Sequence, residues 1–153
     1  MAISALRKPV RILEPLLGSW RHSGDSDLGT LICTRQFVPI LGGHYVRLEA
    51  NWQYDDPKRD DYTELCIFGS GRDKALGFES FINDGSRSYG FATTATDAYS
   101  DAVAFQAEMP HGISRQIYWP ETDGVWKWRV ERKVKSGWNQ IIEHTYTVYS
   151  EAD

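Results

Sequence analysis

Clusters of turn-forming residues divide this chain at nearly even intervals. Glycine, aspartate, asparagine and proline favour turns for separate steric reasons, and from residue 55 onward such clusters recur about every 11 to 14 residues. The stretches between them are rich in aromatic and β-branched side chains, which favour strands, so the spacing predicts an antiparallel meander. The clusters are Asp55-Asp56-Pro57, Gly69-Ser70-Gly71, Asn83-Asp84-Gly85, Thr96-Asp97, Pro110-His111-Gly112, Thr122-Asp123-Gly124 and Lys135-Ser136-Gly137.

These turns leave room for about ten strands. An open sheet of roughly that size would twist strongly and leave unpaired edges, so closure of the sheet is favoured. The sequence therefore predicts an all-β fold, an antiparallel up-and-down barrel of about ten strands. The expected strands are residues 19–24, 29–38, 44–54, 62–69, 75–83, 87–95, 102–109, 113–119, 125–134 and 138–150.

The start of the chain has a different pattern. Apolar residues recur there at helical intervals, but Pro9 and Pro15 limit any helix to one or two short turns. No internal repeat or composition shift marks a second domain, and 153 residues suit one core, so residues 1–153 are expected to form a single domain. The apolar residues at helical spacing are Leu6, Val10, Leu13 and Leu17.

Charge and cysteine content exclude several classes of partner. The net charge of −4 argues against nucleic acid or an anionic membrane surface as the main partner. No apolar run approaches the ~20 residues that cross a bilayer, and the first residues do not resemble a secretory signal. Cys33 and Cys66 are too few for a disulfide scaffold and lack metal-type spacing. We therefore expect a cytoplasmic protein without a metal site.

Polar residues on otherwise apolar strand faces are the best candidates for a functional site. Side chains alternate across a strand, so Arg115 should face inward with Ile117 and Trp119, and His144 should face inward with Ile142 and Tyr146. Each has two readings: an internal ligand anchor, or a structural ion pair or hydrogen-bonded core histidine. Arg35 and Glu64 are weaker candidates, because polar and apolar residues fall on both faces of their strands. Trp138 is expected to face inward as well.

These placements predict a barrel that binds a small apolar or amphipathic ligand, with an anionic group on Arg115. The predicted ligand-binding residues are Arg115, His144, Trp126, Trp128, Tyr146 and Phe105. An enzyme on the same scaffold, of isomerase, cyclase or decarboxylase type, is the alternative, with His144 or Glu64 as acid or base. A barrel filled by its own aromatic side chains, acting through its outer surface, also stays open, as does a homodimer.

Three short motifs resemble those of lipocalins and other calycins. Gly18-Ser19-Trp20, at the start of the first strand, is similar to the Gly-x-Trp signature whose Trp plugs the barrel base in those families. Leu41-Gly42-Gly43-His44-Tyr45 resembles a turn of uncharacterised bacterial lipocalin-like barrels. Their C-terminal pattern is also similar to Gly137-Trp138 and the strand that closes on Tyr146. The resemblance implies the lipocalin or fatty-acid-binding-protein-like barrel, and it implies little about function.

The chain departs from the better-known relatives. The helical lid of fatty-acid-binding proteins has no counterpart between the first two strands, where residues 23–28 form only a short turn. Nitrobindin-type haem barrels use a late-strand histidine, and His144 lies in such a strand, but the Gly-rich motif that follows the first Trp in that family is missing here. No cofactor is therefore predicted, and haem is left as the open alternative.

Overall fold

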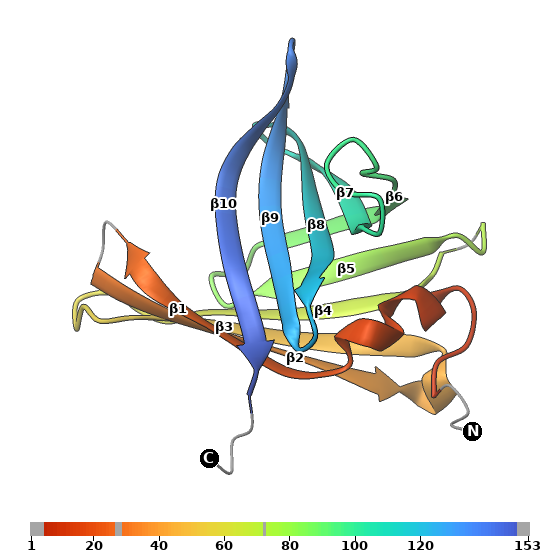
Figure 1. Ribbon diagram of the computed structural model, residues 1–153, viewed down its shortest axis with the longest axis horizontal. Coiled ribbons are helices and arrows are strands. Elements are labelled where there is room, and N and C mark those ends of the chain that lie inside the picture. The colour runs from red at the N-terminus through yellow and green to blue at the C-terminus, as the bar shows by residue number, and fades with distance from the viewer. Residues whose placement is uncertain (1–4, 27–28, 72, 150–153) are drawn as a thin grey trace.

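The computed structural model describes residues 5–26, 29–71 and 73–149, and in this part of the chain ten antiparallel strands close into a barrel (Figure 1). The strands follow one another around the barrel in chain order, and β1 pairs with β10. They are β1 (Gly18–Ser26), β2 (Gly29–Ile40), β3 (Tyr45–Tyr54), β4 (Tyr62–Ser70), β5 (Leu76–Ile82), β6 (Arg87–Thr93), β7 (Val103–Met109), β8 (Gly112–Thr122), β9 (Val125–Val134) and β10 (Gly137–Val148).

The all-β barrel predicted from turn spacing is confirmed. Every expected strand is present, β9 with the expected bounds and the others with ends shifted by at most a few residues. Ser150, the expected end of the last strand, lies outside the described residues. The closed barrel is compatible with the lipocalin-like architecture that the sequence motifs imply. Among the described residues, no helix has both the length and the apolar character needed to cross a membrane.

The predicted N-terminal helical segment is a 3₁₀ helix, η1 (Val10–Leu16), that packs against one end of the barrel (Figure 1). Its inward side chains join the barrel core, and the indole N–H of Trp20 donates to the carbonyl oxygen of Leu16 at 2.8 Å. Trp20 is 7% exposed, as the Gly-x-Trp resemblance implies. A second short 3₁₀ turn, η2 (Leu41–Gly43), lies between β2 and β3. The buried side chains of the N-terminal segment are Leu6, Val10, Leu13 and Leu16.

The faces of β2 and β4, ambiguous in the sequence, are decided by the register of the sheet. Cys33, Arg35 and Phe37 of β2 are buried, and Arg35 lines an internal cavity. In β4, Glu64 lines the same cavity and Cys66 is buried on the same face. Arg35 and Glu64 therefore point into the barrel, although the sequence pattern favours Arg115 and His144 over them as candidates for a functional site.

Trp138 was expected to face inward, and this is wrong. The pairing of β10 with β9 shifts between Gln140 and Ile142, so a bulge reverses the side-chain alternation at that point. Ile142, His144 and Tyr146 keep the inward orientation expected of them, whereas Trp138 lies against Arg115 on the outer face.

Candidate functional site

A cavity of about 440 Å³ lies inside the barrel, and its rim reaches the β3–β4 and β7–β8 turns through Arg59 and His111. The opposite end is packed by η1 and its neighbours. Large apolar side chains form most of the walls, so a ligand of matching size would bury most of its surface here. The apolar wall residues include Trp52, Phe78, Phe105, Trp128, Val130 and Ile142.

Arg35 supplies a buried positive charge to this cavity. Its side chain is on β2, the residue is 3% exposed, and its guanidinium lies 4.2 Å from the ring centroid of Trp128. Nη1 donates to the Tyr118 hydroxyl at 2.8 Å and Nε donates to the Tyr146 hydroxyl at 3.3 Å. Among the described residues Nη2 has no hydrogen-bond partner, and no carboxylate forms an ion pair with Arg35. The Nη2 nitrogen, with its two N–H groups, therefore has no partner in the described part of the chain.

In the part of the chain that the structure describes, Glu64 is the one carboxylate of the cavity wall. Its carboxylate accepts a short hydrogen bond from the hydroxyl of Ser80, which is almost fully buried. The wall also contains Arg35, Arg59 and Arg132, so arginines outnumber carboxylates three to one around the cavity. This local excess is positive, whereas the whole chain carries a net charge of −4. The cavity therefore favours an anionic ligand.

His22 of β1 and His144 of β10 stack face to face, with ring centroids 4.0 Å apart and planes 7° from parallel. The Nδ1 atom of His22 lies 3.0 Å from the carbonyl oxygen of Thr145, and that of His144 lies 3.1 Å from the Tyr146 hydroxyl. Burial, with the neighbouring His22 and Arg35 as further causes, lowers the pKa of His144 to about 3. Burial likewise lowers the pKa of His22. Both rings are therefore neutral at pH 7.

The prediction that Arg115 points into the barrel is wrong. On β8 the cavity-facing residues are Ser114 and Gln116, so Arg115 lies on the outer face. There its Nε donates to Glu131 at 2.7 Å, and its two terminal nitrogens donate to Asp97 at 3.1 and 2.8 Å. Arg115 is 4% exposed. Arg115 therefore belongs to a structural ion pair, which is the second of the two interpretations that the sequence allows.

The cause of this error is a second apolar cluster outside the barrel. The segment between β6 and β7 packs over the outer face of β8 and buries Ile117 and Trp119 there. In the sequence these apolar residues therefore give the same pattern as a face that points into the barrel. The inward residues of β8, Ser114 and Gln116, are polar instead. The outer cluster consists of Ala95, Ala104, Ile117 and Trp119, with Ala102 packed against it.

The remaining predicted site residues divide into two groups. Phe105 and Trp128 line the cavity. Trp126, His144 and Tyr146 point inward without forming its wall, and Tyr146 acts on the cavity through its hydrogen bond to Arg35. Their role as ligand contacts stays a prediction.

Sequence reasoning ranked Arg35 and Glu64 too low. The signal that could have raised Arg35 is its period-two spacing with Leu31, Cys33 and Phe37, all of which are buried.

Comparison with known proteins found no matching family model and no matching curated protein. Within the described residues, no three His, Cys, Asp or Glu side chains gather in a way that could hold a metal ion. What the fold and the site define is a small closed β-barrel with an internal cavity that carries a buried arginine.

Proposed function

We propose that this protein binds a small amphipathic, anionic ligand inside the barrel, with the acidic head on Arg35 and the apolar body against Trp128 and Phe105. The observation that carries the proposal is the free Nη2 donor of a guanidinium that is 3% exposed and lines the cavity. Desolvated cations are costly unless paired, and an anionic ligand would supply the missing partner. We also place the chain among the lipocalin-like barrels and in the cytoplasm, on the motifs and cysteine content given above.

The site geometry favours an acidic head group that can accept hydrogen bonds from a single guanidinium nitrogen, Nη2. Tyr118 and Tyr146 hold two of the three guanidinium nitrogens, which fixes the plane of the fork before a ligand arrives. A prealigned donor reduces the ordering cost of binding. The aromatic walls accept a flat apolar body, because stacking on Trp and Phe adds to burial of its surface.

A titration with two matched probes tests this function. Naphthoate and its neutral counterpart naphthalenemethanol share an apolar body and differ in the acidic head. We expect naphthoate to quench or shift the fluorescence of cavity tryptophans at lower concentration. In Arg35→Leu the preference for naphthoate should shrink by about 1.5–3 kcal/mol, the usual worth of a hydrogen bond to a charged group.

Two variants control this experiment. Arg21→Gln removes one positive charge from an exposed position on the outer side of β1, and it should leave the naphthoate preference unchanged. Arg35→Lys keeps the charge but loses the planar fork, and it should retain only part of the preference. Equal binding of both probes by the wild-type protein, or an unchanged preference in a folded Arg35→Leu protein, would contradict the proposed function.

For the enzymatic alternative, Glu64 is the better placed of the two acid–base candidates. Glu64 lines the cavity, whereas His144 lies behind the wall against His22. An isomerase-type proton transfer would therefore need Glu64 as its base. Loss of turnover in Glu64→Gln with retained naphthoate binding would support an enzyme, and binding without turnover of any kind supports the binding protein.

A further inference from the structure

The outer side of β4, β5 and β6 presents an exposed apolar surface, which we call the β4–β6 face. Side chains that point outward here alternate with buried Cys66, Phe68 and Phe78. Tyr89 is 78% exposed and Phe91 is 52% exposed. The apolar residues of this face are Leu65, Ile67, Phe81, Tyr89 and Phe91, with Tyr45 of β3 at its border.

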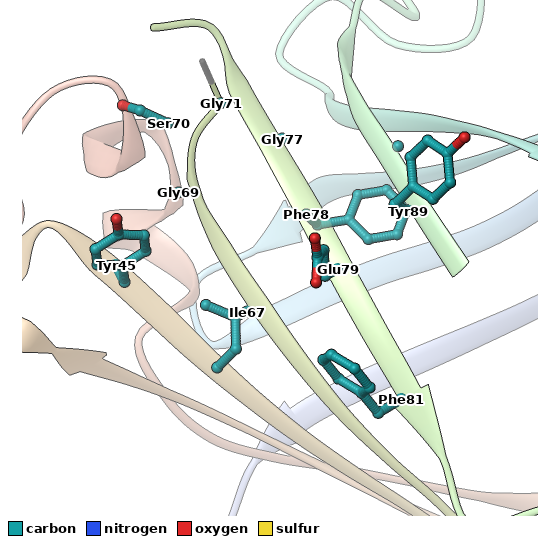
Figure 2. Close-up of a pocket in the computed structure, with 11 residues that line it drawn as sticks. Tyr45, Ile67, Gly69, Ser70, Gly71, Gly77, Phe78, Glu79, Phe81 and Tyr89 are labelled. Atoms are coloured by element: carbon teal, nitrogen blue, oxygen red, sulfur yellow. The ribbon is translucent and has the colours of Figure 1, made fainter. Parts of the chain in front are cut away.

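A hollow of about 480 Å³ indents the β4–β6 face. Gly69 and Gly77 are opposite each other in the register, and both line the hollow. A Cβ atom at Gly69 would overlap the Tyr45 ring, so the close approach of that ring requires glycine. Figure 2 shows Tyr45 and Tyr89 at opposite sides of the hollow, with Ile67 between them. A projecting aromatic ring and a hollow thus lie side by side on one surface.

Among the described residues, the same face carries one acidic side chain, Glu79, and one basic side chain, Arg87. Arg87 Nη2 lies 3.8 Å from Glu79 Oε2, and the side chains are 68% and 63% exposed, so this pair is loose and accessible. The Arg87 guanidinium also lies 4.8 Å from the ring centroid of Phe81. The outer side of β9, by contrast, is dense in charge, with Lys127, Arg129, Glu131 and Lys133. The β4–β6 face is therefore locally neutral and largely apolar in a chain of net charge −4.

We propose that the β4–β6 face binds the same face of a second copy of this chain, forming a two-fold symmetric homodimer. A two-fold interface must be self-complementary. This face carries both members of each proposed contact: a projecting ring with a hollow, and an acidic with a basic side chain. Tyr89 of one copy enters the hollow of the other copy, and Arg87 of each copy meets Glu79 of the other. Two sheet faces pack in the aligned manner of a β-sandwich, which removes the exposed aromatic surface from water.

A concentration series of sedimentation velocity on the full chain is the first test. We expect a monomer–dimer equilibrium in the wild-type protein. Tyr89→Ser should weaken the dimer by roughly tenfold or more, because a buried aromatic anchor commonly acts as a hot spot. Val148→Ser is the matched control, because Val148 is 67% exposed but lies on β10, outside this face. It should leave the dissociation constant unchanged, and circular dichroism checks that both variants fold.

A charge-exchange experiment tests the geometry of the pair. In Glu79→Arg alone, each contact between the copies places one arginine against another. In Arg87→Glu alone, each contact places one carboxylate against another. Because both arrangements are repulsive, each variant by itself should be monomeric. An equimolar mixture of the two variants should form a heterodimer, because both cross-contacts are then attractive. Neither variant contains the Glu79–Arg87 pair within its own chain, so rescue in the mixture reports a contact between copies.

Three outcomes would overturn the proposal. The first is a wild-type protein that stays monomeric at millimolar concentration, which would leave this face to a different partner. The second is a dimer that Tyr89→Ser does not weaken, which would place the interface elsewhere. The third is a mixture of the two charge variants that remains monomeric. The naphthoate titration is independent of all three, because Arg35 lies inside the barrel.

Discussion

Arg35 and Arg115 are both buried, but they have different roles because their hydrogen-bond partners differ. Arg115 faces two carboxylates, Glu131 and Asp97, at hydrogen-bond distance, so its charge is neutralised within the fold. Arg35 donates to two phenol hydroxyls and lies over the Trp128 ring, and the Glu64 carboxylate of the same cavity acts on it electrostatically without forming an ion pair. Because an ion needs a counter-charge where water is excluded, Arg35 has more to gain from an anionic ligand than Arg115, which is already paired with two carboxylates.

Arg115→Leu should destabilise the fold and leave ligand affinity unchanged. It removes one partner of a buried pair, which costs about 3–5 kcal/mol, and we expect a value near the lower end because Arg129 remains 3.4 Å from Glu131. The measurement is chemical denaturation. The double variant Arg115→Leu/Glu131→Leu should recover much of the loss, because no buried unpaired charge is left behind, and Asp97, which is 62% exposed, stays solvated. A double variant no more stable than Arg115→Leu would contradict the ion-pair assignment.

The histidine stack predicts loss of stability in acid. Burial holds the pKa of His144 at about 3, far below its ordinary value of 6.5, so the unfolded state takes up a proton first as the pH falls. The contribution is fully present above pH 6.5 and declines below it, by about 1.4 kcal/mol per pH unit for one such group. Comparing unfolding free energies at pH 7 and pH 5 in wild type and His144→Phe measures this effect, and the variant should show the smaller decline.

At the scale of elements, the N-terminal segment and the first strand act as one unit. Leu13 and Leu16 of η1 pack into the barrel, and the Trp20 indole bonds to the backbone of η1. Pro9 precedes η1 and Pro15 lies inside it, and a proline ring disfavours a longer regular helix.

Trp20→Ala should cost about 3–5 kcal/mol of unfolding free energy, as large aromatic deletions in cores do. The ring is 7% exposed and belongs to the main core cluster. Ile12→Ala is the matched control, because Ile12 lies in the same segment but is 46% exposed, and its loss should stay within about 0.5 kcal/mol. If the two variants lose similar stability, Trp20 does not act as the plug.

For the whole molecule, the shortest strand pairing among the described residues is the one between β1 and β10, which we call the seam. Its ladder pairs Trp20 with Val148 and Arg21 with Thr147, whereas β2 and β3 pair along ten positions. Figure 1 shows β1 and β10 diverging beyond this seam. The stack of His22 on His144 then joins the two strands through side chains where the backbone ladder has ended.

Amide hydrogen exchange should therefore be faster at this seam than in the β2–β3 ladder. A short ladder opens with less free energy than a long one, since fewer hydrogen bonds break together. We expect His22→Ala to accelerate exchange in β1 and β10 further while leaving β2–β3 amides unchanged. Uniform acceleration throughout the barrel would instead indicate global destabilisation, and no acceleration at the seam would show that the stack does not hold it.

The amino-acid sequence by itself determined the strands, their antiparallel order and the N-terminal 3₁₀ segment. These features follow from local chemistry: turn residues impose backbone angles, and side chains alternate every second residue. The faces of β9 were also predictable, because Trp126 and Trp128 alternate with the charged side chains of Lys127 and Arg129 on the outer side. In such strands the local pattern and the final environment agree.

Only the tertiary structure decided which arginine serves the cavity. Alternation separates two faces of a strand but does not say what covers each face. On β8 the covered outer face resembled an interior, which misplaced Arg115. The bulge in β10 moved Trp138 outward. The partners of Arg35 come from β8 and β10, distant in sequence, so its environment exists only once the barrel has closed.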